Sequence, residues 1–196
     1  GKLPKRIRGI NKIIEKNKDE NYIYPFIDLS KKLKSDVIID ANILSAEIDE
    51  TIQMINLILK NGIYVSYVEI GRELTNQSYH ENFDIYKYLE KSKALTERIR
   101  VAFPNIKIGV VAAPIYKSYV KHVNWNKLLS KENFYDAIVV HTYAKVTKGK
   151  DEYGKMVTEY PEGKNKYQAF NIYKKRSLDF FKEYPKEIND YSQMFQ

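Results

Sequence analysis

Four short apolar runs alternate along the chain with longer segments that repeat apolar residues at helical spacing. The runs cover residues 36–43, 64–70, 106–113 and 135–143 and are rich in Val and Ile, which favours buried strands. Between them, apolar residues recur every three or four positions, which predicts helices over 45–60, 82–103 and a stretch containing 125–129. Strands that alternate with helices in this way predict right-handed βαβ units and a parallel sheet, either in a barrel or in an open sheet.

The two ends of the chain carry weaker patterns. Short amphipathic helices are predicted over residues 9–18 and 25–34, the second starting after Pro25. The helix after Ser45 is expected to end at Asn61 and Gly62. Residues 144–166 are rich in Lys and Gly and predict a long loop or a hairpin. A last helix is predicted from 167 to 181, with Tyr184 and Pro185 ending it.

Length and composition narrow the class of protein. A chain of 196 residues fits one domain with a substantial core, but a complete eight-stranded α/β barrel usually needs about 250 residues. Cysteine is absent, so the sequence predicts neither disulfides nor thiol chemistry nor Cys-ligated zinc. We find no apolar stretch of about 18 residues, and residues 1–6 lack the apolar core of a signal peptide. Neither a membrane span nor a signal peptide is therefore predicted in this chain, and a trimmed extracellular protein would look the same.

The net charge of +8 raises the question of an anionic partner. Lysines are mixed with glutamates through the helical segments, as on a solvated surface, and only residues 2–8 and 145–155 are concentrated basic stretches. Neither stretch has the interleaved aromatics of an RNA-binding strand or a helix-turn-helix pattern, and no Gly-rich phosphate loop is present. A nucleic-acid-binding protein, whose affinity would fall steeply with salt, is the weaker alternative.

Polar residues gather where the predicted strands end. In chain order these ends carry Asn42, then Glu69, Arg72 and Glu73, then Ala113 and Pro114, then His141 and Tyr143. The carboxyl ends of parallel strands share one edge of the sheet, so these side chains are expected to converge on one pocket. Sugar hydroxyls need both donors and acceptors, and a glycosidic oxygen needs a carboxylic acid to protonate it as it leaves. The mixture therefore favours a carbohydrate site.

The run from Tyr64 to Glu73 resembles the acid/base strand of retaining glycoside hydrolases of clan A, which have a (β/α)8 barrel and an aromatic residue followed by Glu-x-Gly-Asn-Glu. Residues 139–143 resemble the sixth strand of that clan, in particular of its arabinofuranosidase-like families. Residues 37–42 and 102–109 are similar to its third strand and to its approach to the fifth. The resemblance covers residues 25–183. It implies a single but incomplete barrel domain over 1–196, with about strands three to six and with neither metal nor organic cofactor.

The resemblance also implies roles for individual residues. Glu73 takes the place of the general acid/base, while Asn42, His141 and Tyr143 line the sugar subsite. By strand alternation Glu69 shares a face with Gly71, opposite to Ile70, which suits a supporting residue or an ion pair with Arg72. The family's nucleophile is a Glu in a Thr-Glu-aromatic pattern on the seventh strand. The triplet Thr158-Glu159-Tyr160 has this pattern but leaves no room for a helix after Tyr143, so the nucleophile is either Glu159 or a Glu outside this chain.

Arg72 is the main departure, because the family has Asn at this position. A fixed positive charge favours the ionised form of Glu73, which is the wrong form for proton donation, although it would suit an acidic sugar. Two hypotheses follow for an extracellular or cell-surface protein that is part of a larger polypeptide or complex. One is a glycoside hydrolase-like domain acting on a polysaccharide or glycan by a retaining two-carboxylate mechanism. The other is a non-catalytic carbohydrate-binding domain, so whether the protein is an enzyme stays open.

Overall fold

The computed structural model describes residues 12, 15, 16, 22–75, 83–115, 120–142, 148–150, 156–158 and 166–196. Its contacts gather into two compact units, residues 1–140 and 141–196, which are described separately below. Of the helix predicted over 9–18, the described residues Lys12, Glu15 and Lys16 are helical. The first unit is a mixed α/β structure built on one parallel sheet.

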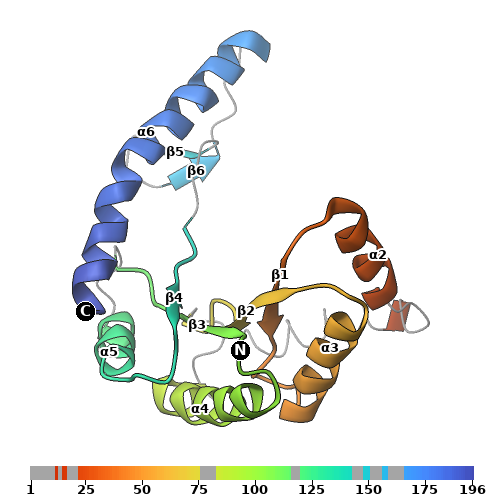
Figure 1. Ribbon diagram of the computed structural model, residues 1–196. Coiled ribbons are helices and arrows are strands. Elements are labelled where there is room, and N and C mark those ends of the chain that lie inside the picture. The colour runs from red at the N-terminus through yellow and green to blue at the C-terminus, as the bar shows by residue number, and fades with distance from the viewer. Residues whose placement is uncertain are drawn as a thin grey trace. The chain divides into compact units, whose positions relative to one another are not determined.

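Four parallel strands form the sheet of the first unit. They are β1 (Val37–Ala41), β2 (Val65–Ile70), β3 (Lys107–Val111) and β4 (Ala137–Val139), hydrogen-bonded in the order β1-β2-β3-β4 (Figure 1). The predicted parallel pairing is confirmed. The prediction that the fourth strand covers 135–143 is wrong: β4 has only three residues, because its bonds to β3 run from the Asp136 amide to the Val139 carbonyl.

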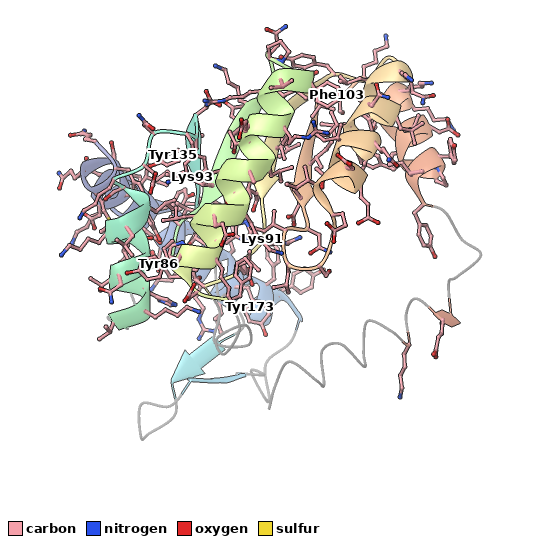
Figure 2. The ribbon with its side chains drawn as sticks, turned by 90° about the horizontal axis from the view of Figure 1, so that it is seen from below. Tyr86, Lys91, Lys93, Phe103, Tyr135 and Tyr173 are labelled. Atoms are coloured by element: carbon pink, nitrogen blue, oxygen red, sulfur yellow. The ribbon has the colours of Figure 1, made fainter. Side chains whose placement is uncertain are left out.

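Three helices connect the strands and lie on one face of the sheet. α3 (Ile48–Lys60), α4 (Ile85–Ala102) and α5 (Val120–Leu129) follow β1, β2 and β3, and α4 packs against both α3 and α5. Right-handed crossovers between strands in consecutive order bring every helix to the same face. Figure 2 shows α4 in front of the strands, with its exposed Tyr86, Lys91 and Lys93 labelled. These helices form a single layer, and none of α3, α4 and α5 covers the opposite face of the sheet.

The two faces of the sheet differ in burial because strand side chains alternate. Toward the helices the strands present a buried apolar layer made of Val37, Ile39, Ala41, Val65, Val68, Ile70, Ile108 and Val110. On the opposite face Ile38 is 64% and Tyr67 36% exposed, and Asp40 and Lys107 are also exposed. The core of this unit therefore lies between the sheet and the helices.

Local signals explain where the helices begin and end. The first turn of α3 is closed by a reciprocal capping box between Glu47 and Glu50, so the helix starts two residues later than Ser45 suggests. Its end at Asn61 and Gly62 is confirmed. The helix before β1, α2 (Ile23–Leu33), starts before Pro25 rather than after it. Proline is tolerated there because the first-turn N–H groups have no partner within a helix.

The second unit contains a two-stranded antiparallel hairpin, β5 (Lys148–Lys150) and β6 (Met156–Thr158), followed by α6 (Lys166–Met194). Of the two structures predicted for 144–166, the hairpin is the one observed. The prediction that Tyr184 and Pro185 end the last helix is wrong, since Pro185 lies inside α6. A proline ring removes one N–H donor, and the turns on either side keep their own bonds. Among the described residues no helix is long and apolar enough to cross a membrane.

Two glycines at positive φ provide a test of the turn after β2. Gly71 has φ of +74° and a Cβ built there would lie 2.5 Å from Leu74 Cδ1, whereas Gly62 has φ of +77° and nothing within 4 Å. Both Ala variants carry the cost of a left-handed residue, about 1–2 kcal/mol, but only Gly71→Ala adds overpacking. We expect Gly71→Ala to lower the free energy of unfolding by about 2–4 kcal/mol and Gly62→Ala by about 1–2 kcal/mol, measured by urea denaturation. Equal losses would contradict the tight packing at Gly71.

Candidate functional site

The loops that follow β1 and β2 meet at the carboxyl edge of the sheet. The Gly71 amide donates to the Ala41 carbonyl at 2.9 Å, which extends the β1–β2 ladder by one bond. Beyond it, the buried side chains of Ile43 and Leu74 approach the same glycine. The structure thus brings Asn42, which directly follows β1, and the Arg72–Glu73 pair, which follows β2, to neighbouring strand ends.

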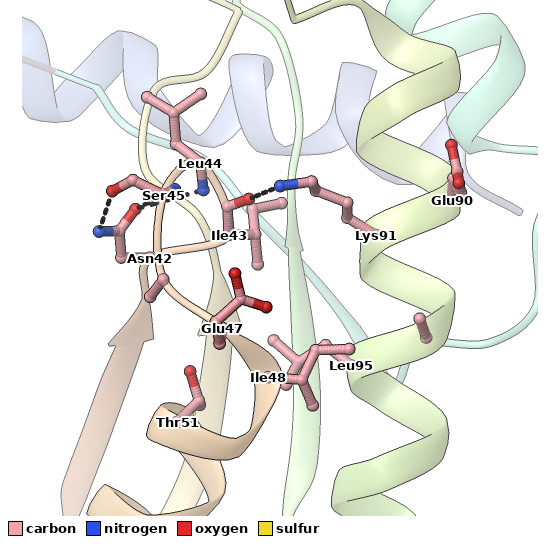
Figure 3. Close-up of a pocket in the computed structure, with 12 residues that line it drawn as sticks. Asn42, Ile43, Leu44, Ser45, Glu47, Ile48, Thr51, Glu90, Lys91 and Leu95 are labelled. Carbon is pink, nitrogen blue, oxygen red and sulfur yellow. Dashed lines mark hydrogen bonds between the residues drawn. The ribbon is translucent and has the colours of Figure 1, made fainter.

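Asn42 shapes the turn between β1 and α3. Its Oδ1 accepts from the amides of Leu44 and Ser45 at 3.2 and 3.3 Å, and its Nδ2 donates to Ser45 Oγ at 2.9 Å (Figure 3). These bonds are those of an Asx turn, which explains the residue type without a ligand. The side chain is nevertheless exposed, so it remains accessible from solvent.

A pocket of about 290 Å³ lies between this turn and α4. It is lined by Asn42, Ser45, Glu47 and Thr51 on one side and by Glu90, Lys91 and Leu95 on the other (Figure 3). Lys91 Nζ donates to the Ile43 carbonyl at 2.9 Å, and Glu47 belongs to the capping box of α3. The polar groups that line the pocket therefore also stabilise the fold. Glu69 and Glu73 do not line this pocket.

Glu69 lies on the sheet face away from the helices. The register pairs it with Asp40 on β1 and with Gly109 on β3, while its neighbour Ile70 is fully buried on the helical side. The predicted alternation of Glu69 and Ile70 is confirmed. Because neighbouring strands lie about 4.8 Å apart, Asp40 and Glu69 place two carboxylates side by side on the open face.

The turn after β2 holds Glu73 in an unusual backbone conformation. Its φ of 50° lies in the left-handed region, and Gly71, two residues earlier, lies there too. The turn is anchored on its far side, where Leu74 and Thr75 are buried and His122 Nε2 lies 3.3 Å from the Thr75 carbonyl. A carbonyl can only accept, so Nε2 carries the proton in this bond. Arg72, between the two left-handed residues, is exposed and has no hydrogen bond or ion pair with the part of the chain that the structure describes.

A tyrosine from α4 is hydrogen-bonded to the ends of both β2 and β3. The Tyr88 hydroxyl donates to the Ile70 carbonyl at 2.9 Å and accepts from the Val111 amide at 2.8 Å. Ile70 pairs with Val110, so in a regular parallel ladder its carbonyl would accept directly from the Val111 amide. The hydroxyl therefore binds both backbone groups of the last position in the β2–β3 ladder.

Two residues of α5 bind the end of β3 in the same way. Trp125 Nε1 donates to the Val111 carbonyl at 2.9 Å. The Asn126 amide makes two bonds to Ala113, accepting from its N–H at 2.8 Å and donating to its carbonyl at 2.9 Å. The sequence reasoning missed these residues. Their signal is the spacing of His122, Trp125, Asn126 and Leu129, which puts all four on one helix face, where all are buried.

The remaining predicted site residues lie beyond the first unit. His141 follows β4 by two residues and is half-buried in the second unit, while Tyr143 and Glu159 lie outside the described residues. The expected convergence of His141, Tyr143 and Glu159 with the strand ends therefore stays a prediction. Within the described ranges, no three His, Asp or Glu side chains gather in a way that would hold a metal ion.

The bidentate bonds of Asn126 lead to a mutational prediction. Asn126→Ala would leave the buried N–H and carbonyl of Ala113 without partners, each at a cost of about 1–3 kcal/mol. We expect a loss of about 2–4 kcal/mol in the free energy of unfolding, measured by urea denaturation. Asn124→Ala, on the exposed face of the same helix, is the matched control and should stay within about 0.5 kcal/mol of the wild type.

Burial raises the pKa of Tyr88 above its usual range, mainly through desolvation, and the nearby Glu69 charge acts in the same direction. The folded state therefore holds the phenol proton more tightly than the unfolded state, so this group stabilises the fold fully below about pH 10 and progressively less above it. We expect the stability difference between wild type and Tyr88→Phe to shrink as the pH rises from 10 to 11.5, in urea titrations. A difference that grows with pH would show that the hydroxyl ionises readily in the folded protein.

Comparison with known proteins does not assign this chain to a family. No protein-family model matches it, and neither does any curated protein or any solved structure.

Proposed function

We propose that this chain is a glycoside hydrolase-like domain in which β1 to β4 correspond to about strands three to six of a (β/α)8 barrel. Consecutive strand order with all connecting helices on one face is the arrangement of a barrel wall, whereas a doubly wound sheet reverses its order and has helices on both faces. Four strands do not close a barrel, so the proposal requires further strands beside β1 and β4.

The observation that carries the proposal is the conformation of Glu73. Among the described residues only Lys34 and Glu73 have positive φ without being glycine, and Lys34 is an ordinary left-handed helix cap. A left-handed glutamate at the carboxyl end of a buried strand is strained, and such strain concentrates at functional sites. The carboxyl edge is also where barrels of this class place their catalytic residues.

The proposed chemistry is a retaining double displacement. Glu73 gives its proton to the glycosidic oxygen while the C–O bond breaks and a second carboxylate attacks the anomeric carbon. Glu73, now ionised, then takes a proton from the water that attacks the same carbon and releases the nucleophile. In this scheme the nucleophile is Glu159 or a Glu on a strand outside this chain, and no metal or organic cofactor takes part. Retaining enzymes keep their two carboxyl groups about 5 Å apart.

The other residues have binding roles in this proposal. Asn42, with its exposed amide, and His141 and Tyr143, which follow β4 in the chain, would hydrogen-bond sugar hydroxyls. The substrate would be a polysaccharide or glycan met outside the cell or at its surface. Glu69, on the open sheet face beside Asp40, would support the site electrostatically rather than touch the scissile bond.

Arg72 favours a second candidate, a carbohydrate-binding domain without catalysis. Its guanidinium is exposed directly before Glu73 and unbonded to the described part of the chain, so it is available to a carboxylate of an acidic sugar. A permanent cation beside Glu73 also favours the ionised carboxylate, which binds hydroxyls but does not protonate a leaving group.

The two candidates separate in one experiment on the protein that carries these residues within a complete barrel. If it is an enzyme, Glu73→Gln should lower the rate of glycan cleavage by about 10²–10⁴-fold, because the amide cannot transfer a proton. Binding of the same glycan should remain measurable by calorimetry. Glu97→Gln, an exposed glutamate on α4, is the charge-matched control and should cleave like the wild type.

The opposite outcomes are equally informative. Cleavage that survives in Glu73→Gln would remove the assigned role of Glu73. A wild-type protein that binds glycans, cleaves none from a broad panel, and loses its preference for acidic glycans in Arg72→Asn would establish the binding domain instead.

A further inference from the structure

We propose that Tyr88 is a positioning residue: its hydroxyl, hydrogen-bonded to the ends of both β2 and β3, fixes the start of the turn that carries Glu73. The catalytic part of this inference rests on the proposed function. The structural part, that Tyr88 holds the turn from Gly71 to Thr75, does not.

The hydrogen bonds of the Tyr88 hydroxyl support its role at the start of the turn. One hydroxyl joins the Ile70 carbonyl at 2.9 Å and the Val111 amide at 2.8 Å, so a single side chain of α4 links the last residues of β2 and β3. Gly71 follows Ile70 directly and its own amide is bound to Ala41 on the other side. The last residue of β2 therefore pairs with β3 in the ladder and is also bound by Tyr88, while its successor is tied to β1.

The tyrosine itself has little freedom. Its side chain is fully buried, and its ring packs on Trp125 with a centroid distance of 4.7 Å and an interplanar angle of 39°. The indole of Trp125 is fixed in turn by its bond to the Val111 carbonyl. The amide of the same residue, Val111, donates to Tyr88. Packing from α5 and hydrogen bonds to β2 and β3 thus hold the hydroxyl in one place.

The effect on Glu73 follows from the short path between them. Only Gly71 and Arg72 separate Ile70 from Glu73, and the turn is bound again at Thr75, where His122 lies 3.3 Å from the carbonyl. Without the hydroxyl, the Ile70 carbonyl and the Val111 amide lose this shared partner and can move relative to each other. Such a movement shifts the start of the turn against its fixed far end, and a shift of about 1 Å in a reacting group can cost about 10²-fold in rate.

The test compares Tyr88→Phe with two control variants. Tyr135→Phe removes a hydroxyl that binds the Leu129 carbonyl at 3.3 Å, away from the strand ends. Trp125→Phe removes the donor to the Val111 carbonyl and leaves the contact to Ile70 in place. Hydrogen exchange measured by mass spectrometry on the chain of 196 residues, at a pH and temperature where all variants are folded by circular dichroism, reports on the turn directly.

We expect amide exchange in residues 71–75 to accelerate about 5-fold in Tyr88→Phe, the factor given by the loss of one ordinary hydrogen bond. It should be unchanged in Tyr135→Phe, and Trp125→Phe should affect residues 111–113 instead. Equal exchange of 71–75 in wild type and Tyr88→Phe overturns the proposal. Equal acceleration in Trp125→Phe also overturns it, because the effect would then be general loosening.

If the complete barrel cleaves glycans, Tyr88→Phe should lower kcat by about 10–100-fold at nearly unchanged KM and should move the pH optimum, because Glu73 changes its surroundings. A smaller folded fraction would lower the rate without moving the pH profile, so an unmoved profile contradicts the catalytic part. If no glycan is cleaved, the proposed function fails and the exchange data alone decide whether Tyr88 holds the turn.

Discussion

The structure depends on one topological constraint: four parallel strands lie in consecutive order, and each crossover between them has the same hand. This puts α3, α4 and α5 into a single layer and leaves the opposite sheet face without them. The helical face can then be wholly apolar, while the other face tolerates Asp40 and Glu69 as direct neighbours. The same constraint brings the carboxyl ends of all four strands to one edge, where the turn with Glu73 lies.

At that edge, side chains add to the backbone hydrogen bonding of the strands. The carbonyl of Ile70, both polar groups of Val111 and both of Ala113 are bound by Tyr88, Trp125 and Asn126. Buried backbone groups must be paired, so each of these side chains allows a strand to leave the ladder without a desolvation cost. The strand ends can therefore separate, and the turns that carry polar residues can be held in defined positions.

The residues of the site could be predicted where a charged side chain ends an apolar strand. Residues that act through their burial could be predicted only in part. Glu69, Arg72 and Glu73 stand out because charged residues rarely end an apolar run, and strand alternation placed Glu69 opposite to Ile70 as observed. Tyr88 and Asn126 did not stand out, because a tyrosine or asparagine on a helix resembles any surface residue until burial is known. Asn42 was expected to face a sugar, yet its bonds to Leu44 and Ser45 show that it also shapes the turn.

The sequence by itself determined the four strands, their parallel pairing, the helices between them and the end of α3 at Gly62, since these follow from local periodicity and from turn residues. It misjudged Pro185, because a ring that removes one N–H does not end a helix whose flanking turns are intact. Only the tertiary structure decided that the helices share one layer, that Glu73 adopts a left-handed conformation and that Tyr88 binds the ends of two strands. These features arise from contacts between residues far apart in the chain, and a local sequence pattern does not predict such contacts.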